Sequence, residues 1–308
     1  MLVYHDGLME MNDLSNYIIE KNDLFSLVND EKPETEFDIE NYVYDLIKNY
    51  QNYNTITESV YILSKGRADC GFTHLTLQKD NIPYKIMVEP QDYDDYIKYH
   101  DPNTIVKMDK NNGGIEYVRN YIKEYSKNRN EKWHWQMDDD IQKFKIRIND
   151  KNIETKGLNN LSIVEKTTKL FNNVAISGLA SSAFAFSKKV PVKVNQLAYS
   201  CVLANNDVDI KWSIGGCEDW HYTLNVLEDN WCTISFSHIL FDAPGTAVQK
   251  GGSMVHWESK EKRKKLYDHF VSFWPKNFVV KPMTGPKGWK LQHKRRFFAD
   301  YKQKLILN

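Results

Sequence analysis

The stretch Trp133-His-Trp-Gln-Met-Asp-Asp-Asp-Ile141 joins an alternating apolar run to three consecutive carboxylates. Trp133, Trp135 and Met137 recur at every second position, which is the period of a strand with one buried face. We therefore expect a buried strand that ends at the aspartates. Adjacent carboxylates repel one another, so solvent, basic side chains or a cation must offset their charge. Oxygen ligands of this kind suit Mg²⁺ or Mn²⁺, and the alternative is a solvated acidic turn.

The composition bounds the class of protein. Of the 308 residues, 41% are hydrophobic, 13% aromatic and 27% charged. These values are typical of a globular protein with one large α/β domain and additions, or with two small domains. We identify no secretory signal and no apolar run near the roughly 18 to 20 residues of a membrane span. The cysteines lack Cys-x-x-Cys spacing, so we expect free thiols and a cytoplasmic location. They are Cys70, Cys201, Cys217 and Cys232.

The formal net charge is zero, but the charges are unevenly distributed along the chain. Residues 1–58 hold 3 Lys or Arg against 13 Asp or Glu, whereas residues 258–308 hold 14 against 4. A basic end on a neutral protein indicates a polyanionic partner, and the alternative is that the two ends pair with each other. We divide the chain into an acidic helical N-terminal extension (1–57), a central domain (58–257) and a basic, aromatic, helical C-terminal extension (258–308). Amphipathic helices are expected at residues 14–27 and 39–50.

The first half of the central domain has the pattern of a parallel sheet. Residues 59–63, 84–88 and 104–108 are short apolar runs typical of buried strands, and helices are expected at residues 72–80 and 115–127. Strands and helices in this alternation predict parallel pairing. In such sheets, ligands bind beyond the carboxyl ends of the strands.

Three polar segments lie where these strands or their connections end. They are Ser64-Lys-Gly-Arg-Ala-Asp69, Glu89-Pro-Gln91 and Asn111-Asn-Gly-Gly114. The two glycines of the last segment allow the backbone to approach a ligand, and the helix after them offers free N–H groups to an anion. Arg67 and Asp69 of the first segment either contact a ligand at this edge of the sheet or pair with each other across the turn.

The second half of the central domain contributes a carboxylate pair. Gly215-Gly-Cys-Glu-Asp219 precedes a helix expected at residues 220–228. Residues 174–187 are small and apolar and predict a tightly packed strand pair beside a substrate, whereas residues 150–161 predict a polar loop. His238 and His256 each follow a predicted strand. His238 is interpreted as structural or close to a phosphate, and the alternative is that it is a ligand.

This order of features is similar to that of GT-A nucleotide-sugar transferases, in which a nucleotide half, an Asp-x-Asp segment and an acceptor half with a Glu-Asp pair follow one another. The resemblance implies an α/β fold with a mixed, mainly parallel sheet flanked by helices. A metal and cations would neutralise the diphosphate leaving group. A carboxylate would act as base if transfer inverts the anomeric centre.

In combination, four motifs resemble those of the TET-associated glycosyltransferases. They are Ser64-Lys-Gly-Arg-Ala-Asp69, Ile82-Pro-Tyr84 with Val88-Glu-Pro-Gln91 and Tyr93, Gly113-Gly-Ile-Glu-Tyr-Val-Arg-Asn120, and the stretch that contains the triple aspartate. That family, common in bacteriophages, includes relatives of the base-J glucosyltransferase. The resemblance covers residues 59 to about 257. It implies transfer from a UDP-sugar to hydroxymethylcytosine or hydroxymethyluracil in double-stranded DNA, inside a phage-infected bacterial cell.

The resemblance also implies roles for individual residues. Asp138 and Asp140 would hold Mn²⁺ or Mg²⁺, with His256 as a third ligand. Asp219 or Glu218 would act as the catalytic base, and the two remain alternatives. The residues expected to bind the nucleotide-sugar are Ser64, Arg67, Asp69, Glu89, Gln91, Gly114, Arg119, Asn120, Asp138 and Asp139.

The basic C-terminal extension mixes cations with aromatic side chains. The cations would neutralise DNA phosphates and the aromatics would stack on an exposed base. Alternatively, the aromatics seat the extension on the transferase and the cations are solvated. The expected DNA-binding cations are Arg263, Lys264, Lys294, Arg295 and Arg296, and the aromatics are Phe273, Trp274, Trp289, Phe297 and Phe298. Two rival functions are a GT-A transferase acting on a glycan or protein, and a non-catalytic nucleic-acid-binding protein on a transferase scaffold.

Overall fold

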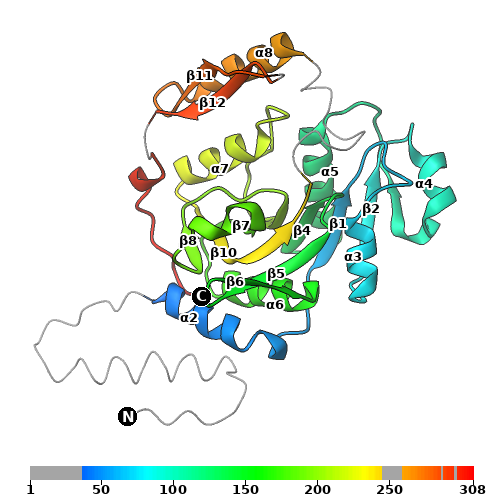
Figure 1. Cartoon of the computed structure of the whole chain (residues 1–308). Helices are drawn as coiled ribbons and strands as arrows, with labels where there is room; N and C mark the ends of the chain where they lie inside the picture. Colours follow the sequence, from blue (N-terminus) through cyan, green and yellow to red (C-terminus); the bar gives the residue numbers. More distant parts are fainter. Residues whose placement is uncertain (1–36, 245–258, 286, 295–296) are drawn as a thin grey trace, which may run out of the picture.

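The computed structural model describes residues 37–244, 259–285, 287–294 and 297–308. Its centre is a ten-stranded sheet in the order β3-β2-β1-β4-β9-β7-β10-β5-β6, with β8 paired to β10. Helices cover both faces of the sheet and give three layers (Figure 1). The strands of this sheet are β1 (Ser59–Leu63), β2 (Lys85–Val88), β3 (Ile105–Lys107), β4 (Trp133–Asp138), β5 (Lys143–Ile148), β6 (Lys151–Thr155), β7 (Val174–Ser181), β8 (Val192–Val194), β9 (Cys201–Asn205) and β10 (Cys232–Asp242). The helices are α2 (Ile39–Lys48), α3 (Thr73–Lys79), α4 (Tyr93–Tyr99), α5 (Ile115–Lys127), α6 (Gly157–Thr168), α7 (Glu218–Glu228) and α8 (Lys260–Phe273).

The sheet has a parallel half and a largely antiparallel half. Strands β3, β2, β1 and β4 pair in parallel, as their alternation with helices predicted. On the other side of β4, from β9 to β6, neighbouring strands pair antiparallel, except that β7 and β10 pair in parallel. The mixed α/β sheet flanked by helices is thus confirmed. The two halves meet at β4, so the aspartates that follow this strand lie at the boundary between them.

The alternation in β4 sorts its side chains between the two helical layers. Trp133, Trp135 and Met137 are at most 5% exposed and join the core that packs against α2, α3 and α6. Their burial confirms the predicted strand. Burying each such side chain contributes about 1.5–3 kcal/mol. The indole Nε1 of Trp135 also donates to Glu165 Oε1 at 2.8 Å, so its polar atom is satisfied inside the core.

The opposite face of the parallel half packs against α5. Tyr61 and Leu63 of β1 contact Val118 and Ile122 in this layer. The residues of β4 that point the same way are His134, Gln136 and Asp138, since they alternate with the aromatic set. Polar side chains on this face therefore have their partners on α5, which is the local reason that the helix carries a buried arginine.

The antiparallel half differs from the sequence expectations in three places. Residues 150–161 form β6 and the first turns of α6 where a polar loop was expected, because β6 is a largely exposed edge strand paired with β5. Residues 174–187 form one strand, β7, followed by the 3₁₀ helix η3 (Ser182–Ser187), not a strand pair. His238 lies within the eleven-residue strand β10 and not after it.

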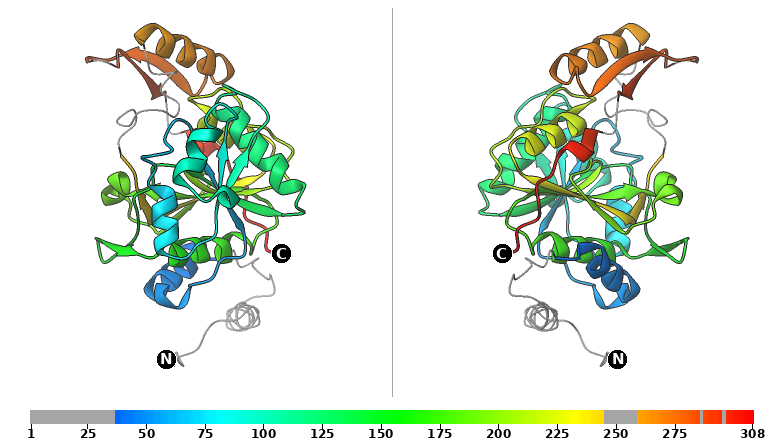
Figure 2. Two further views of the ribbon diagram at one scale, coloured as in Figure 1. Left: turned by 90° about the vertical axis from the view of Figure 1, so that its right-hand side faces the viewer. Right: turned by 90° about the vertical axis from the view of Figure 1, so that its left-hand side faces the viewer.

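The extensions are described in part. Helix α2 confirms the expected helix at 39–50, whereas the helix expected at 14–27 lies outside the described residues. The C-terminal extension is not wholly helical, because α8 is followed by the hairpin β11 (Phe278–Pro282) and β12 (Trp289–His293) and the 3₁₀ helix η5 (Phe297–Asp300). Figure 2 shows α8 and this hairpin at the end of the molecule opposite α2. In the part of the chain that the structure describes, no helix is long and apolar enough to cross a membrane.

Candidate active site

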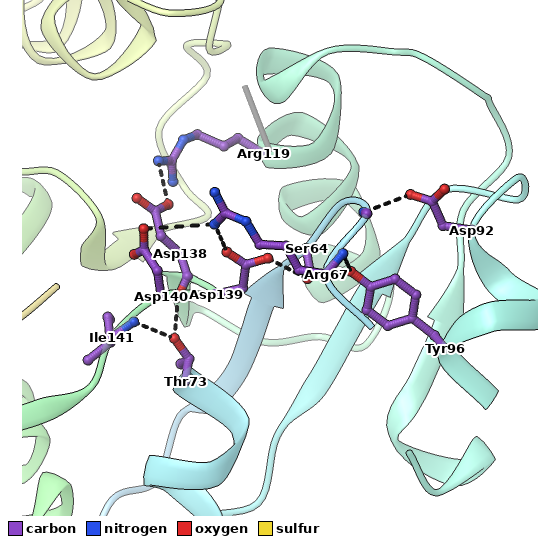
Figure 3. Close-up of polar contacts among 11 residues, drawn as sticks. Ser64, Arg67, Thr73, Asp92, Tyr96, Arg119, Asp138, Asp139, Asp140 and Ile141 are labelled. Carbon is purple, nitrogen blue, oxygen red and sulfur yellow. Dashed lines mark hydrogen bonds and ion pairs between the residues drawn. The ribbon is translucent and has the colours of Figure 1, made fainter. Parts of the chain in front are cut away.

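The turn after β4 is held by a threonine at the start of α3. Thr73 Oγ1 donates to the carbonyl oxygen of Asp138 at 2.5 Å and accepts the N–H of Ile141 at 2.9 Å (Figure 3). The carbonyl of Asp139 accepts two further N–H groups, from Phe72 at 2.8 Å and Thr73 at 3.1 Å. Three adjacent carboxylates are therefore fixed by backbone contacts with the α3 N-terminus.

Asp139 faces the loop that follows β1. Its carboxylate pairs with the guanidinium of Arg67 and accepts the hydroxyl of Ser64 at 2.5 Å. Tyr96 Oη lies 2.6 Å from Ser64 Oγ and accepts the N–H of Arg67 at 3.1 Å. The Asp139 side chain is 8% exposed. It therefore holds this loop through its contacts with Ser64 and Arg67 and has little surface left for a ligand.

Arg119 joins the two halves of the sheet. From α5, its Nη2 lies 3.3 Å from Asp138 Oδ1 and 3.3 Å from Asp219 Oδ1, and its Nε lies 3.5 Å from Glu218 Oε1. The side chain is 1% exposed. Burial opposes the charge of Arg119, but the three carboxylates outweigh burial and raise its pKa. Arg119 is therefore a fully buried cation that holds the carboxylates in one cluster.

Asp140 has the weakest compensation of its charge. Arg67 Nη1 is 3.8 Å away, and the Asp140 side chain is 25% exposed. Burial and the neighbouring charges of Asp138 and Asp139 raise its pKa to about 7. Counting Glu218 and Asp219, five carboxylates share two arginines in the ion pairs of the described cluster. The excess negative charge can be compensated by a cation.

Glu218 and Asp219 open α7 but differ in what they contact. Glu218 Oε2 accepts the N–H of Gly216 at 2.9 Å, where Gly216 has φ +87° and bends the chain into the helix. Asp219 is held by Arg119 and keeps 25% of its side chain exposed. Burial, together with the charges of Glu218 and Asp138, raises the pKa of Asp219 above its usual range although Arg119 acts in the opposite sense. A carboxylate with a raised pKa is better suited to accept a proton.

Glu89 and Gln91 form a second network, at the end of β2. Glu89 is 1% exposed, accepts the N–H of Gly113 at 2.8 Å and pairs with Lys65 at 2.6 Å. Gln91 donates to Glu89 at 2.9 Å and to Asn112 at 3.1 Å. These contacts fix the loop that ends at Gly114, the N-cap of α5, whose φ is +84°. The loop that delivers Arg119 is thus tied to the end of β2.

A model of the TET-associated glycosyltransferases matches residues 58–252, more than half of the chain. The chain belongs to this family. It is therefore a glycosyltransferase, and the carboxylate cluster at the boundary of its two half-sheets is the candidate active site. No protein with curated annotation matches the chain significantly.

The transferase brings most of the predicted site residues together. Ser64, Arg67, Arg119, the three aspartates, Glu218 and Asp219 form the contacts described above. Asn120 differs, because both polar atoms of its side chain bond to the backbone of Trp212, at 2.8 and 3.0 Å. It ties α5 to the segment that leads into α7. Asp69 lines a hollow beside α4 together with Asp92 and Tyr96.

The predicted DNA-binding cations of the transferase divide into three groups. Arg263 is 6% exposed, so the structure corrects the expectation that it presents its charge at the surface. Lys264 pairs with Asp268 at 2.6 Å, and the exposed Lys294 donates to the carbonyl of Pro275 at 2.5 Å. Arg295, Arg296 and the predicted metal ligand His256 lie outside the described residues.

Several aromatics of the C-terminal extension pack against α7 and against one another. Phe297 is fully buried, and Trp274 Nε1 donates to His221 Nδ1 at 3.0 Å. The burial of Phe297 corrects the expectation that this ring is exposed for stacking on a base. Phe298 stacks on Trp220 of α7, with ring centroids 5.9 Å apart.

Sequence reasoning missed Thr73 and Tyr96 as organisers of the site. A threonine at the start of a helix has the pattern of an ordinary cap, and nothing in its spacing predicts a bond to a turn 65 residues away. Tyr96 lies on the buried side of α4, where the residue pattern indicates core packing. His238, considered as structural, has its Nε2 3.2 Å from the carbonyl oxygen of Lys188.

Proposed function

We propose that this glycosyltransferase moves a sugar from a UDP-sugar to the hydroxymethyl group of a 5-hydroxymethylpyrimidine in DNA, with the help of a divalent metal. The observation that carries the proposal is the position of Arg119, which places the donor-side carboxylate Asp138 and the acceptor-side carboxylate Asp219 around one nitrogen atom. Inverting transfer uses one carboxylate as base for the acceptor hydroxyl, and another can hold a metal against the diphosphate leaving group.

The residues present fit a metal that is shared with the substrate. Asp138 and Asp140 keep 31% and 25% of their side chains exposed, and the cluster carries excess negative charge. Among the described residues no group of three or more potential ligands forms a complete metal site. Mg²⁺ is commonly held by one or two carboxylates together with substrate phosphates. Bound there, Mg²⁺ or Mn²⁺ would neutralise charge on the diphosphate.

The chain's own side chains then account for the transfer. Arg67 lies beside Asp140 and would contact the diphosphate from the side of β1. Asp219 would accept the proton of the acceptor hydroxyl while the hydroxyl oxygen forms a bond to the anomeric carbon of the sugar. The bond between that carbon and the diphosphate oxygen breaks at the same time, and the UDP keeps the bonding electrons. This arrangement inverts the anomeric centre.

A DNA acceptor is supported by the charge of the C-terminal extension. Lys281 and Lys290 are exposed and lie opposite each other on β11 and β12. Lys287 and Lys294 are also exposed on or next to this hairpin. Cations on a rigid surface neutralise phosphates, whereas a glycan acceptor gains little from them. The intact carboxylates argue against the rival of a non-catalytic binding protein.

The test is a transfer assay analysed by nucleoside mass. The full chain is incubated with Mn²⁺ or Mg²⁺, a panel of UDP-sugars, and duplexes that contain hydroxymethylcytosine, hydroxymethyluracil or unmodified cytosine. A hexose or pentose mass on a hydroxymethylated nucleoside alone is the expected result, and Asp219→Asn is the matched control. Transfer to glycans or a protein in parallel reactions, with none to DNA, would assign the rival acceptor class.

A further inference from the structure

A cavity of about 500 Å³ lies between the antiparallel half of the sheet and the C-terminal extension. Its walls include Lys188 and Lys193, Tyr199, Trp220 from α7 and Phe298 from η5. The volume is within the roughly 300–1,000 Å³ of small-molecule sites. The extension therefore completes a cavity that the central domain alone would leave open.

This cavity adjoins the carboxylate cluster through two of its residues. Trp220 follows Asp219 in the first turn of α7. Tyr199 precedes Ser200, whose carbonyl accepts the N–H of Asp138 at 2.8 Å. Burial raises the pKa of Tyr199, and the charge of Asp219 raises it further, as expected for a phenol near that carboxylate. A group seated in the cavity would thus lie on the acceptor side of the cluster.

The side chains that line the cavity suit a ligand that has both a flat ring system and negative charge. Aromatic rings on several walls can stack on a flat heterocycle such as a nucleic-acid base. Lys188 and Lys193 supply positive charge, whereas none of the described residues that line the cavity is acidic. Ser235 and Ser237 add hydroxyl groups. A nucleotide combines a flat base with phosphate, so it matches this lining.

The 3₁₀ helix η3, which contributes Phe184 to the wall of the cavity, carries a second exposed phenylalanine two residues later. Phe184 and Phe186 in η3 are 61% and 77% exposed. Between them Ala185 is fully buried, and its carbonyl accepts the N–H of Lys188 at 3.0 Å. His238 Nε2 bonds to the carbonyl of Lys188 at 3.2 Å. The turn is anchored while its rings face solvent, and apolar side chains so placed can enter between base pairs.

Resting on the proposed function, we propose that the cavity is the acceptor-nucleotide site. The hydroxymethylpyrimidine leaves the base stack and enters the cavity, where its hydroxymethyl group reaches Asp219. Lys188 and Lys193 contact the phosphates beside it, and Phe186 fills the gap left in the duplex. Enzymes that act on a base in duplex DNA need such exposure, and they offset the cost of unstacking by contacts in a pocket.

The first test reports base exposure and needs no sugar donor. A duplex carries the fluorescent base 2-aminopurine next to a hydroxymethylcytosine, and its emission rises when the target base leaves the stack. The wild-type chain should raise the emission severalfold, and Phe186→Ala should remove most of the rise. Ile153→Ala, a change of an exposed apolar residue on β6, is the matched control and should behave as wild type. An emission that does not rise, or that Phe186→Ala leaves unchanged, overturns the proposal.

The second test compares duplex with single-stranded acceptor. Phe186→Ala should lower transfer to duplex by about tenfold, equal to roughly 1.4 kcal/mol of barrier, while transfer to a single strand stays within about threefold. Lys193→Ala should weaken transfer to both acceptors, and Lys132→Ala is its control because that lysine is 61% exposed and does not line the cavity. Equal losses on both acceptors for Phe186→Ala would contradict its role in the duplex.

The two tests separate this proposal from the proposed function. If the wild type glycosylates modified DNA but the cavity variants match it in both tests, the cavity site is wrong and the function stands. If the wild type modifies no DNA, the proposed function fails, and the fluorescence test still shows whether a base leaves the stack. Melting temperatures within about 2 °C of wild type confirm that the variants are folded.

Discussion

A single nitrogen atom of Arg119, Nη2, lies 3.3 Å from Asp138 and 3.3 Å from Asp219. The two carboxylates belong to the end of β4 and the start of α7, on the two sides of the sheet boundary. A cation shared at such distances sets their separation, because each carboxylate would otherwise repel the other. The buried guanidinium therefore couples the stability of the fold to the geometry of the site.

Removal of this cation should destabilise the protein and stop transfer. Arg119→Met leaves three carboxylates without their buried partner, and such a loss costs about 3–5 kcal/mol. Urea unfolding followed by circular dichroism measures the change. Arg119→Lys keeps the charge without the planar fork, so it should fold more stably than Arg119→Met and still transfer poorly. A wild-type unfolding midpoint for Arg119→Met would show that the carboxylates do not depend on it.

Substitution of Asp140 should lower activity without lowering stability. Asp140→Asn should reduce turnover by at least about 10²-fold, or roughly 2.7 kcal/mol of barrier. The same change removes repulsion from two neighbouring carboxylates, so the metal-free protein should melt no earlier than wild type. Mn²⁺ together with UDP should raise the melting temperature of the wild type and leave the variant almost unshifted. Full activity of the wild type in EDTA would exclude the metal.

Thr73 tests whether the backbone of the aspartate turn matters for catalysis. Thr73→Val keeps the shape of the side chain but leaves the N–H of Ile141 without its acceptor, which costs about 1–3 kcal/mol. Transfer should fall as the turn loosens, measured as kcat at saturating donor and acceptor. Thr73→Ser retains the hydroxyl and is the control. Equal kcat for the valine and serine variants would show that the turn holds its shape without this bond.

The hairpin of the C-terminal extension should contribute to DNA affinity through charge alone. Lys281 and Lys290 are both replaced by Ala. The slope of log affinity against log salt concentration should become less negative by roughly 0.9 for each phosphate that the variant no longer neutralises. Donor affinity and melting temperature should stay at their wild-type values. Replacement of Lys79 and Lys132 together removes two exposed lysines away from the hairpin, of 75% and 61% exposure, so it controls for net charge. An unchanged salt slope in the double variant would place the DNA elsewhere on the transferase.

The parallel half of the fold and the acidic turn were predictable because the local pattern agrees with the tertiary structure. In β4 each apolar residue at an alternate position enters the core, and the first polar run marks the end of the strand. Glycines before α5 and α7 likewise signalled two helix starts, and both deliver site residues. Such features depend on residues that are close in sequence.

The features that sequence did not predict depend on distant partners. The bond between Thr73 and the aspartate turn, and the burial of Arg263, arise from packing that no local period records. The segment after β7 is as apolar as a strand, yet it turns into η3 once Ala185 is buried against Ala180 and Leu240. The cavity beside Asp219 needs residues from both the central domain and η5, so its lining is scattered along the chain.

The contacts of Glu218 and Asp219 favour Asp219 as the base in the proposed reaction. Glu218 accepts the N–H of Gly216 and closes the turn before α7, which is a structural task that a glutamine can also perform. Asp219 has no such backbone bond among the described contacts, and it neighbours the residues that line the cavity. Asp219→Asn should therefore lower the transfer rate by about 10²–10⁴-fold, the usual contribution of a general base, whereas Glu218→Gln should retain most of it.

Single-turnover rates with a saturating UDP-sugar and hydroxymethylated duplex distinguish the two residues, and nuclear magnetic resonance of the product gives the anomeric configuration. Asp219 would be assigned as the base if the product is inverted and if Asp219→Asn loses transfer while Glu218→Gln retains it. The reverse ranking of the two variants would transfer the role to Glu218 and make the Gly216 bond incidental. Retention of configuration would remove the need for a base at either position, and both carboxylates would then serve to hold Arg119 and the acceptor in place.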